Sequence, residues 1–149
     1  MYAAVVLTEE SRNKLLKHPE VVKRIGNEDT PLLTELMEPI AHHMTVVPNL
    51  KTREADWWRN IIPPDRISLE VTHIGGWLHP RCSPRINPSL WAVRVKTNVW
   101  TRNQTPHITL AINREDAKDY TVWPSHSNLI TKWTPIKPIT LKGYMDVCE

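Results

Sequence analysis

Short apolar runs separated by polar segments recur along the whole chain. The runs are rich in β-branched residues and too short for buried helices, which indicates strands. One segment also alternates, so that Ile67, Leu69, Val71 and His73 share a face, while Gly75-Gly76 predicts a bulge or a bend. Strands are predicted over 2–8, 43–47, 67–77, 91–96, 107–112 and 136–147, the last as one strand or a strand pair.

Helical signals are concentrated near the start of the chain. Thr8 can cap a helix because acidic residues occupy the turn that follows it. Pro19 and Gly26 stand in the order expected for the start and the end of a second helix. Helices are predicted over 9–17, 20–25, 31–37 and 127–133, the last capped by Ser127; segment 57–64 predicts a loop or one helical turn, and 79–88 a proline-rich loop.

The mixture of strands and helices predicts an α+β fold. The length of 149 residues and the 40% apolar content predict one domain over 1–149. The composition adds 13 Pro with only 4 Gly, which indicates rigid loops, and 7 Trp with no Phe. Burial is the ordinary use of tryptophan, so we expect most of these rings in the core and some facing a ligand.

The sequence carries no signal for a membrane or for secretion. No apolar run approaches the ~20 residues of a membrane-spanning helix, and the N-terminus lacks the basic start and cleavage site of a secretory signal. Cys82 and Cys148 have no metal-ligand spacing and are too few for a disulfide framework. We therefore expect a soluble cytoplasmic protein (in the host cytoplasm, if the chain is viral) that needs no metal or cofactor.

Charge suggests a small anionic ligand. The formal net charge is +3 and the basic residues are scattered, which suits a compact anion better than duplex DNA. A second phosphate can be neutralised by basic residues, although solvated surface charges are their commoner role. The candidates are Arg81, Arg85, Arg94, Lys96 and Arg102 for phosphate, and Tyr2, Trp77, Trp123, Trp133 and Tyr144 for base stacking, with core packing as the commoner role of these rings.

Two of the predicted strands begin with the same pattern, His-x-Thr. These are His43-Met44-Thr45 and His107-Ile108-Thr109. Residues i and i+2 of a strand point the same way, so each copy presents an imidazole beside a hydroxyl. If the two strands lie side by side, one neutral imidazole can take a proton from an attacking oxygen while the other, protonated, delivers one to the leaving oxygen. The threonine hydroxyls can donate to the phosphate oxygens as charge builds.

The two motifs, each followed by aliphatic residues, resemble those of the two-histidine (2H) phosphoesterase superfamily. The opening strand and helix also resemble that LigT-like fold, and the likeness extends to the final strand. The resemblance implies two β-lobes of antiparallel strands around a central cleft with flanking helices. It also implies a catalytic set of His43, Thr45, His107 and Thr109, with no order of base and acid between the histidines.

Within that superfamily, the length and the short gap between motifs are most similar to phage anti-CBASS enzymes, which degrade cyclic oligonucleotide immune signals. The resemblance therefore implies a metal-independent hydrolase of 3′–5′ phosphodiester bonds that serves immune evasion. An RNA 2′,3′-cyclic phosphodiesterase in RNA end processing is the enzymatic alternative. Two further classes remain open: a module that only sequesters a nucleotide, and a structural domain in which both motifs are coincidental.

Two other histidines invite interpretation. His42 adjoins His43, but neighbours in a strand face opposite ways and no metal-binding pattern accompanies them. His73 shares a face with apolar residues, which is more typical of a hydrogen-bonded sheet histidine than of a catalytic one. Neither is included in the predicted site, and the sequence does not indicate an oligomeric state.

Overall fold

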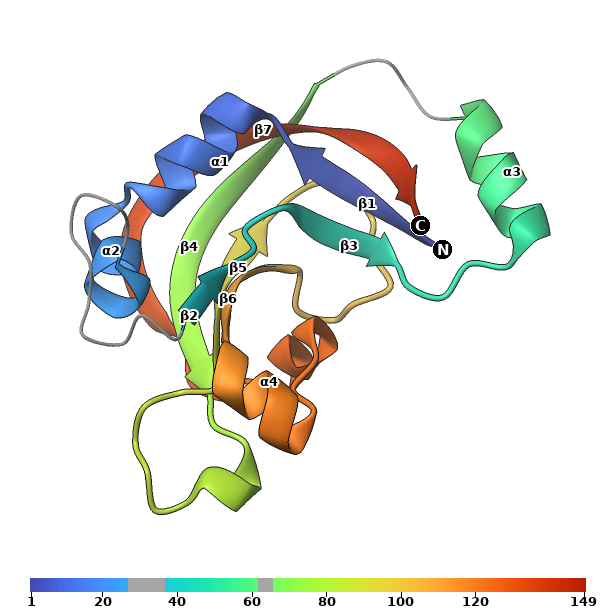
Figure 1. The fold of residues 1–149 in the computed structure, drawn as a ribbon. Coiled ribbons are helices and arrows are strands. Elements are labelled where there is room, and N and C mark those ends of the chain that lie inside the picture. The colour runs from blue at the N-terminus through green and yellow to red at the C-terminus, as the bar shows by residue number, and fades with distance from the viewer. Residues whose placement is uncertain (27–36, 62–65) are drawn as a thin grey trace.

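Seven strands form one antiparallel sheet in the computed structural model, which describes residues 1–26, 37–61 and 66–149. Six of the strands close into a ring in the order β6-β3-β1-β7-β4-β5, because β5 pairs with β6 (Figure 1). The seventh strand, β2, pairs with β6 on the same edge as β3, further along β6. The strands are β1 (Tyr2–Leu7), β2 (Met37–Pro39), β3 (His43–Val47), β4 (Ile67–Trp77), β5 (Leu90–Lys96), β6 (His107–Asn113) and β7 (Thr134–Cys148).

The helices lie around this barrel-like sheet. Thr8 caps α1 as expected, since its hydroxyl accepts from the backbone N–H of Ser11 at 3.2 Å, and Gly26 ends α2 with a φ of 68°. The helices are α1 (Glu9–Leu16), α2 (Pro19–Ile25), α3 (Thr52–Ile61) and α4 (Arg114–Tyr120), with short 3-10 helices η1 (Pro80–Cys82) and η2 (Pro124–Leu129). No helix in these ranges is both long and apolar enough to cross a membrane.

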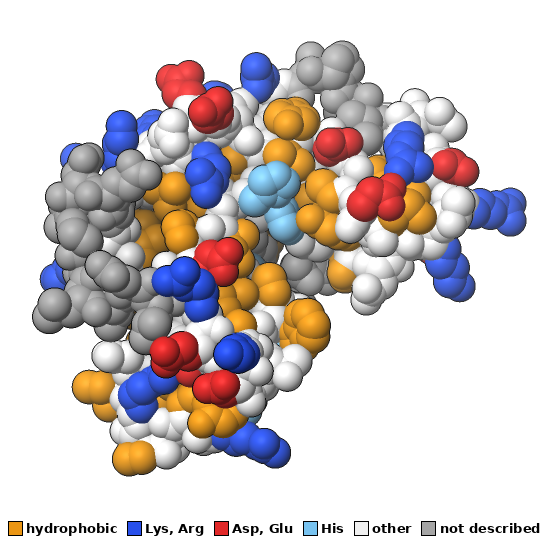
Figure 2. Space-filling model, in the orientation of Figure 1, with side chains coloured by type: hydrophobic (Ala, Val, Ile, Leu, Met, Phe, Trp, Pro, Cys, Tyr) orange, Lys and Arg blue, Asp and Glu red, His pale blue; other side chains and the backbone are white. Residues whose placement is uncertain are grey.

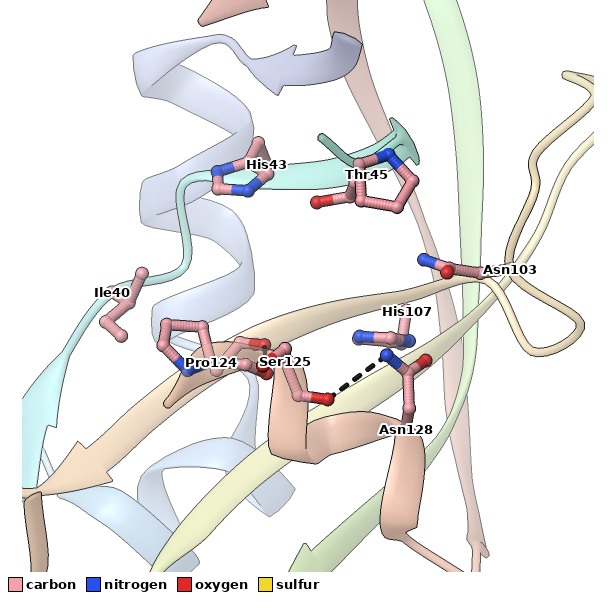
Figure 3. A pocket seen from close by; sticks show the side chains of 10 residues that line it. Ile40, His43, Thr45, Asn103, His107, Pro124, Ser125 and Asn128 are labelled. Atoms are coloured by element: carbon pink, nitrogen blue, oxygen red, sulfur yellow. Dashed lines mark hydrogen bonds between the residues drawn. The ribbon is translucent and has the colours of Figure 1, made fainter. Parts of the chain in front are cut away.

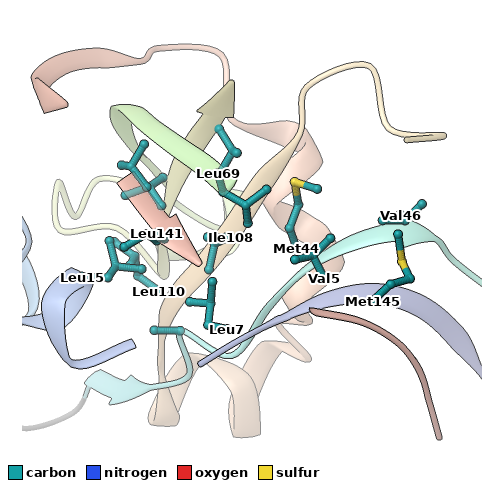
Figure 4. Close-up of a cluster of buried hydrophobic side chains, with 14 of the residues drawn as sticks. Val5, Leu7, Leu15, Met44, Val46, Leu69, Ile108, Leu110, Leu141 and Met145 are labelled. Carbon is teal, nitrogen blue, oxygen red and sulfur yellow. The ribbon is translucent and has the colours of Figure 1, made fainter. Parts of the chain in front are cut away.

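The inside of the ring is filled with aliphatic side chains. Alternate residues of each strand point inward, and the largest of them are completely buried (Figure 4). Burying each of these Leu, Ile or Met side chains stabilises the fold by roughly 1.5–3 kcal/mol before entropy is counted. The inward set includes Met44, Leu69, Ile108, Leu110 and Leu141.

The α+β class and the antiparallel strands agree with the sequence analysis, but the strands are not divided between two sheets. Every strand of the described ranges belongs to the single ring or to its extension, because β5 pairs with β6 as well as with β4. This extra pairing closes the sheet on itself, which removes its free edges. The expected division into two lobes is therefore replaced by one continuous sheet.

Several local predictions are wrong. Segment 57–61 belongs to the ten-residue helix α3. The polar stretch 114–120, for which no helix was predicted, is helix α4, whose first turn is capped by Asn113. The predicted helix over 127–133 does not form: residues 127–129 belong to the 3-10 helix η2, residues 130–133 are in neither helix nor strand, and Ser127 lies inside η2 and does not cap it. The bulge of β4 lies between Val71 and His73, before the two glycines.

Other predictions are met or lie outside the described ranges. The final segment is one long strand, and the strands at 43–47 and 67–77 have the predicted bounds. The proposed helix over 31–36 falls outside the described residues, while Met37 begins β2; residues 62–64 of the predicted loop also fall outside them. Of the 7 Trp, four are half-buried against the hydrophobic clusters and three are exposed, namely Trp57, Trp100 and Trp123.

Candidate functional site

Strands β3 and β6 are antiparallel neighbours, which brings the two His-x-Thr motifs together. Their pairing sets Met44 opposite Ile108. An antiparallel ladder then runs in opposite directions from that pair, so His43 comes opposite Thr109 and Thr45 comes opposite His107. Because Met44 and Ile108 point into the core, the four motif side chains share the other face of the sheet.

The four motif side chains line one pocket. Figure 3 shows His43 and Thr45 projecting from β3 toward His107 on β6 and toward side chains of η2. The structure thus brings together all four residues that the sequence analysis selected. The remaining lining consists of Ile40, Pro48, Asn103, Pro124, Ser125 and Asn128.

A backbone kink separates β2 from β3 and sets the course of the first motif. Ala41 has a φ of 40°, an unfavourable value for a residue with a Cβ. The backbone on both sides is held by hydrogen bonds: the N–H of Ala41 donates to the carbonyl of Thr109 at 3.0 Å, and the N–H of Leu7 donates to the carbonyl of His42 at 3.0 Å. The surrounding sheet therefore enforces the kink, and β3 then pairs with β6 at Met44 opposite Ile108.

His107 is held in one tautomer. Its Nδ1 lies 2.8 Å from the backbone carbonyl oxygen of Thr105, and because a carbonyl only accepts, Nδ1 carries the hydrogen. The lone pair is then on Nε2, the ring nitrogen left for the pocket. Burial lowers the pKa of His107, with the bond to Thr105 opposing that shift, so the neutral form is favoured. These features suit a general base.

His43 is also kept neutral. Burial, followed by positive charge on His42 and on His107, lowers its pKa from the usual 6.5 to about 4. Its Nδ1 lies 3.0 Å from Nδ1 of His42, and the ring of Tyr2 packs against it with centroids 5.0 Å apart. Nδ1 is thus engaged outside the pocket, which leaves Nε2 for a ligand.

The two threonines are not equivalent. The Thr109 hydroxyl lies 3.2 Å from the carbonyl oxygen of Pro124 and 2.8 Å from the hydroxyl of the buried Ser127. A hydroxyl has one hydrogen, so that of Thr109 is committed to η2 in either arrangement. The Thr45 hydroxyl is half-exposed in the pocket and has no partner within the described part of the chain. Thr45 is therefore free to donate to a ligand, whereas Thr109 anchors η2.

Three polar side chains of the pocket are not among the site residues predicted from the sequence. Asn103 comes from the loop between β5 and β6, and Ser125 and Asn128 come from η2. The Asn128 amide donates to the carbonyl of Ser125 at 3.1 Å, which steadies its side chain. No local pattern in the sequence marks Asn103, Ser125 or Asn128 as site residues.

The pocket suits a phosphate group in size and polarity. Its volume is about 150 Å³, smaller than the ~300–1,000 Å³ of pockets that enclose a whole drug-sized ligand. Among the described residues, its lining holds hydroxyl, amide and imidazole groups and no Lys, Arg, Asp or Glu. A protonated histidine is thus the only positive charge that these lining residues can offer to an anion.

The remaining candidates lie elsewhere. His73 is hydrogen-bonded, with Nδ1 2.8 Å from the hydroxyl of Thr72, as expected for a sheet histidine. Arg85 forms an ion pair with the buried Asp116. None of the basic or aromatic candidates named from the sequence lines the pocket. Both cysteines are free, and the described residues include no group of three or more His, Cys, Asp or Glu that could hold a metal ion.

Comparisons with family models, with curated proteins and with solved structures find no match for this chain.

Proposed function

We propose that this protein is a metal-independent phosphodiesterase of the two-histidine type that cleaves 3′–5′ bonds of cyclic di- or oligonucleotide signals, as the phage anti-CBASS enzymes do. The observation that carries the proposal is the pairing of β3 with β6. It brings both imidazoles and the Thr45 hydroxyl into one pocket, at the register Met44 opposite Ile108. Acid–base catalysis requires two proton carriers on one reacting group, and this arrangement supplies them.

The reaction begins with attack by the ribose 2′-hydroxyl next to the scissile phosphate. Nε2 of His107 takes the hydroxyl proton while the 2′ oxygen bonds to phosphorus. The bond from phosphorus to the 5′ oxygen breaks, and Nε2 of His43 delivers a proton to that leaving oxygen. The products are a 2′,3′-cyclic phosphate and a free 5′-hydroxyl.

The order of base and acid follows from the partners of the two rings. The carbonyl of Thr105 fixes the hydrogen of His107 on Nδ1, which makes Nε2 a base. His43 has a different neighbour, because the imidazole of His42 can accept from Nδ1 when His43 carries two protons. A bound phosphodiester anion raises the pKa of His43, because an opposite charge nearby favours the imidazolium. Substrate binding therefore favours protonation of His43, which can then act as the general acid.

The first step leaves the two histidines in the protonation states that hydrolysis of the cyclic phosphate requires. After the first step His107 is protonated and His43 is neutral, so His43 can activate a water molecule that opens the cyclic phosphate. His107 then returns its proton to the departing ribose oxygen. Thr45 donates to a phosphate oxygen as negative charge builds, with Asn103 and Ser125 as further neutral donors.

The proposal is tested with a panel of cyclic di- and trinucleotides and a nucleoside 2′,3′-cyclic phosphate, each in excess EDTA. We expect wild-type protein to cleave the cyclic oligonucleotides with a transient 2′,3′-cyclic phosphate visible by phosphorus NMR. His43→Ala and His107→Ala should each lower kcat by about 10²–10⁴-fold, the usual contribution of a general acid or base. His73→Ala, on β4 outside the pocket, is the control and should retain activity.

Each other outcome has a defined meaning. Turnover of the nucleoside 2′,3′-cyclic phosphate alone would assign the site to RNA end processing. Tight binding without turnover, unaffected by either histidine substitution, would assign the protein to the sequestering modules. Full activity of His107→Ala would refute the two-histidine mechanism.

A further inference from the structure

A second concave surface lies beyond the pocket, toward α3. Three tryptophans and two arginines line this tryptophan groove, whose volume is about 720 Å³. That is within the range of pockets that hold small-molecule ligands. Its lining is Val47, Arg53, Glu54, Trp57, Trp58, Trp100 and Arg102.

The groove continues the pocket along the same strand. Thr45 lines the pocket and Val47, two residues further along β3, lines the groove, with a bulge in the pairing of β3 with β1 between them. Residues two positions apart along a strand are within about 7 Å of each other. The step from pocket to groove is thus short enough for one ligand to occupy both.

The loop between β5 and β6 joins the two surfaces a second time. Its backbone is tied to β3, because the N–H of Arg102 donates to the carbonyl of Val46 at 2.8 Å. Within the loop, the Thr101 hydroxyl donates to the carbonyl of Asn103 at 2.8 Å. The loop therefore presents Trp100 and Arg102 to the groove and Asn103 to the pocket.

The aromatic rings of the groove are exposed in spite of their size. Trp57 is 57% exposed and Trp100 is 64% exposed. Trp58 packs partly on the core and meets Trp57 edge to face, with ring centroids 5.5 Å apart and an interplanar angle of 89°. This contact braces Trp57 and leaves it available for a flat ligand. Figure 2 shows hydrophobic surface between the histidines and α3 on the face that carries them.

Charge favours an anion in the groove. Arg53 and Arg102 are exposed, and their guanidinium groups form no ion pair within the described ranges. The single carboxylate of the lining, on Glu54, accepts from the backbone N–H of Lys51 at 3.4 Å. Stacking rings beside unpaired cations are the combination that binds single-stranded nucleotides.

We propose that the tryptophan groove binds the nucleotide adjacent to the scissile phosphate, its base stacking on Trp57 or Trp100 and its second phosphate meeting Arg102 or Arg53. This inference rests on the proposed phosphodiesterase function and deepens it. The substrate must then carry at least two nucleotides and two phosphates. A mononucleotide places its one phosphate in the small pocket and has no second phosphate for the arginines of the groove.

The test measures binding without turnover, using ligands that lack the attacking 2′-hydroxyl. The probes are a deoxydinucleotide with a 3′-phosphate and a deoxynucleoside 3′-phosphate, titrated into full-length protein while tryptophan fluorescence is recorded. We expect the dinucleotide to quench fluorescence and to bind at least tenfold more tightly than the mononucleotide. Trp100→Ala should weaken dinucleotide binding by about tenfold or more, since base stacking on one ring contributes that much.

Arginine substitution supplies a second, independent readout. Arg102→Gln should weaken dinucleotide binding and reduce its dependence on salt concentration, because one phosphate contact is lost. Two matched controls lie outside both surfaces: Trp123→Ala removes a tryptophan of similar exposure, 59%, and Arg81→Gln removes an exposed arginine of η1. Both control variants should bind the dinucleotide as the wild type does. Thermal denaturation of each variant verifies folding.

Three results would overturn the inference. Equal affinity for the two probes, unchanged by Trp100→Ala, would show that the groove is unused even if the enzyme cleaves cyclic nucleotides. If Trp123→Ala weakened dinucleotide binding as much as Trp100→Ala does, the effect of Trp100→Ala would not be specific to the groove. Concentration-dependent dimerisation lost in Trp57→Ala would assign the surface to a second copy of the chain. Failure of the proposed function is distinguishable, because it appears as absent turnover with the dinucleotide still bound.

Discussion

The environment of His43 predicts that the protein loses stability when the pH falls from 7 to 5. In the folded chain the pKa of His43 is about 4, whereas in the unfolded chain the ring is solvated and has its usual pKa of 6.5. Between these two values the unfolded state binds more protons than the folded state. The free energy of unfolding therefore decreases as the pH falls through this window.

The size of the effect follows from the two pKa values. At pH 7 the ring is largely neutral in both states and the penalty is small. At pH 5 the unfolded ring is protonated and the folded ring is not, which costs the folded state about 2 kcal/mol relative to pH 7. Burial also lowers the pKa of His107, so its contribution has the same sign.

The assay is urea denaturation of the wild type and of His43→Gln at pH 7 and pH 5. The glutamine variant cannot titrate at this position, so its loss of stability between the two pH values should be smaller than that of the wild type by about 2 kcal/mol. Thr45→Val is the matched control, because it changes a neighbour in the same pocket without removing a titrating group. It should lose as much stability as the wild type.

An equal loss in wild type and His43→Gln would refute the reasoning, since it would place the pH-sensitive group elsewhere. NMR titration of the His43 ring gives an independent check. Adding a non-cleavable phosphodiester, such as the deoxydinucleotide, should raise the measured pKa of His43. An unchanged pKa of His43 with ligand bound would refute its role as a general acid that becomes protonated on substrate binding.

Three further substitutions test how the fold holds the site. Gly75→Ala should destabilise the protein by about 1–3 kcal/mol in urea denaturation, because its Cβ would lie 2.7 Å from the Ile130 side chain and 2.9 Å from a backbone oxygen; unchanged stability would contradict this contact. Ser127→Ala should cost about 1 kcal/mol and raise KM more than it lowers kcat, because η2 loses its buried bond to Thr109; steady-state kinetics with an unchanged KM would count against that anchor. Thr8→Ala should cost about 1 kcal/mol of thermal stability through loss of the α1 cap and leave kcat/KM unchanged; altered catalysis would mean that α1 influences the pocket.

The elements that could be predicted from sequence are those whose signal is local. Strand periodicity and β-branched content identified β3 and β4 with their observed bounds, and the residues that cap or flank α1 and α2 identified those helices. Helices α3 and α4 were missed because neither has a clear helical pattern of apolar residues. Helix α3 contains two adjacent tryptophans, and α4 is a short polar segment. The one local signal of α4 is its cap, since the Asn113 side chain accepts from the backbone N–H groups of Glu115 and Asp116.

The predicted site residues followed from a repeated pattern, while the missed ones had none. Each His-x-Thr copy indicates that its histidine and threonine share a face of one strand, and this inference needs no tertiary information. The groove tryptophans were overlooked because a tryptophan is usually buried, and nothing local distinguishes Trp57 or Trp100 from Trp58. Their positions are tertiary features, because Trp57 lies on α3 and Trp100 on the loop that is hydrogen-bonded to β3.

The sequence by itself therefore determined six of the seven described strands, the α+β class and the two imidazole–hydroxyl pairs, because strand periodicity and capping are properties of neighbouring residues. Only the tertiary structure decided that β3 lies beside β6, that the sheet closes through β5, and that η2 engages Thr109 and leaves Thr45 free. The same is true of the different hydrogen-bond partners of the two histidines, which are the His42 ring for His43 and the carbonyl of Thr105 for His107. The physical reason is that long-range pairing, burial and hydrogen-bond partners come from segments far apart along the chain, and these decide which proton each group can give or take.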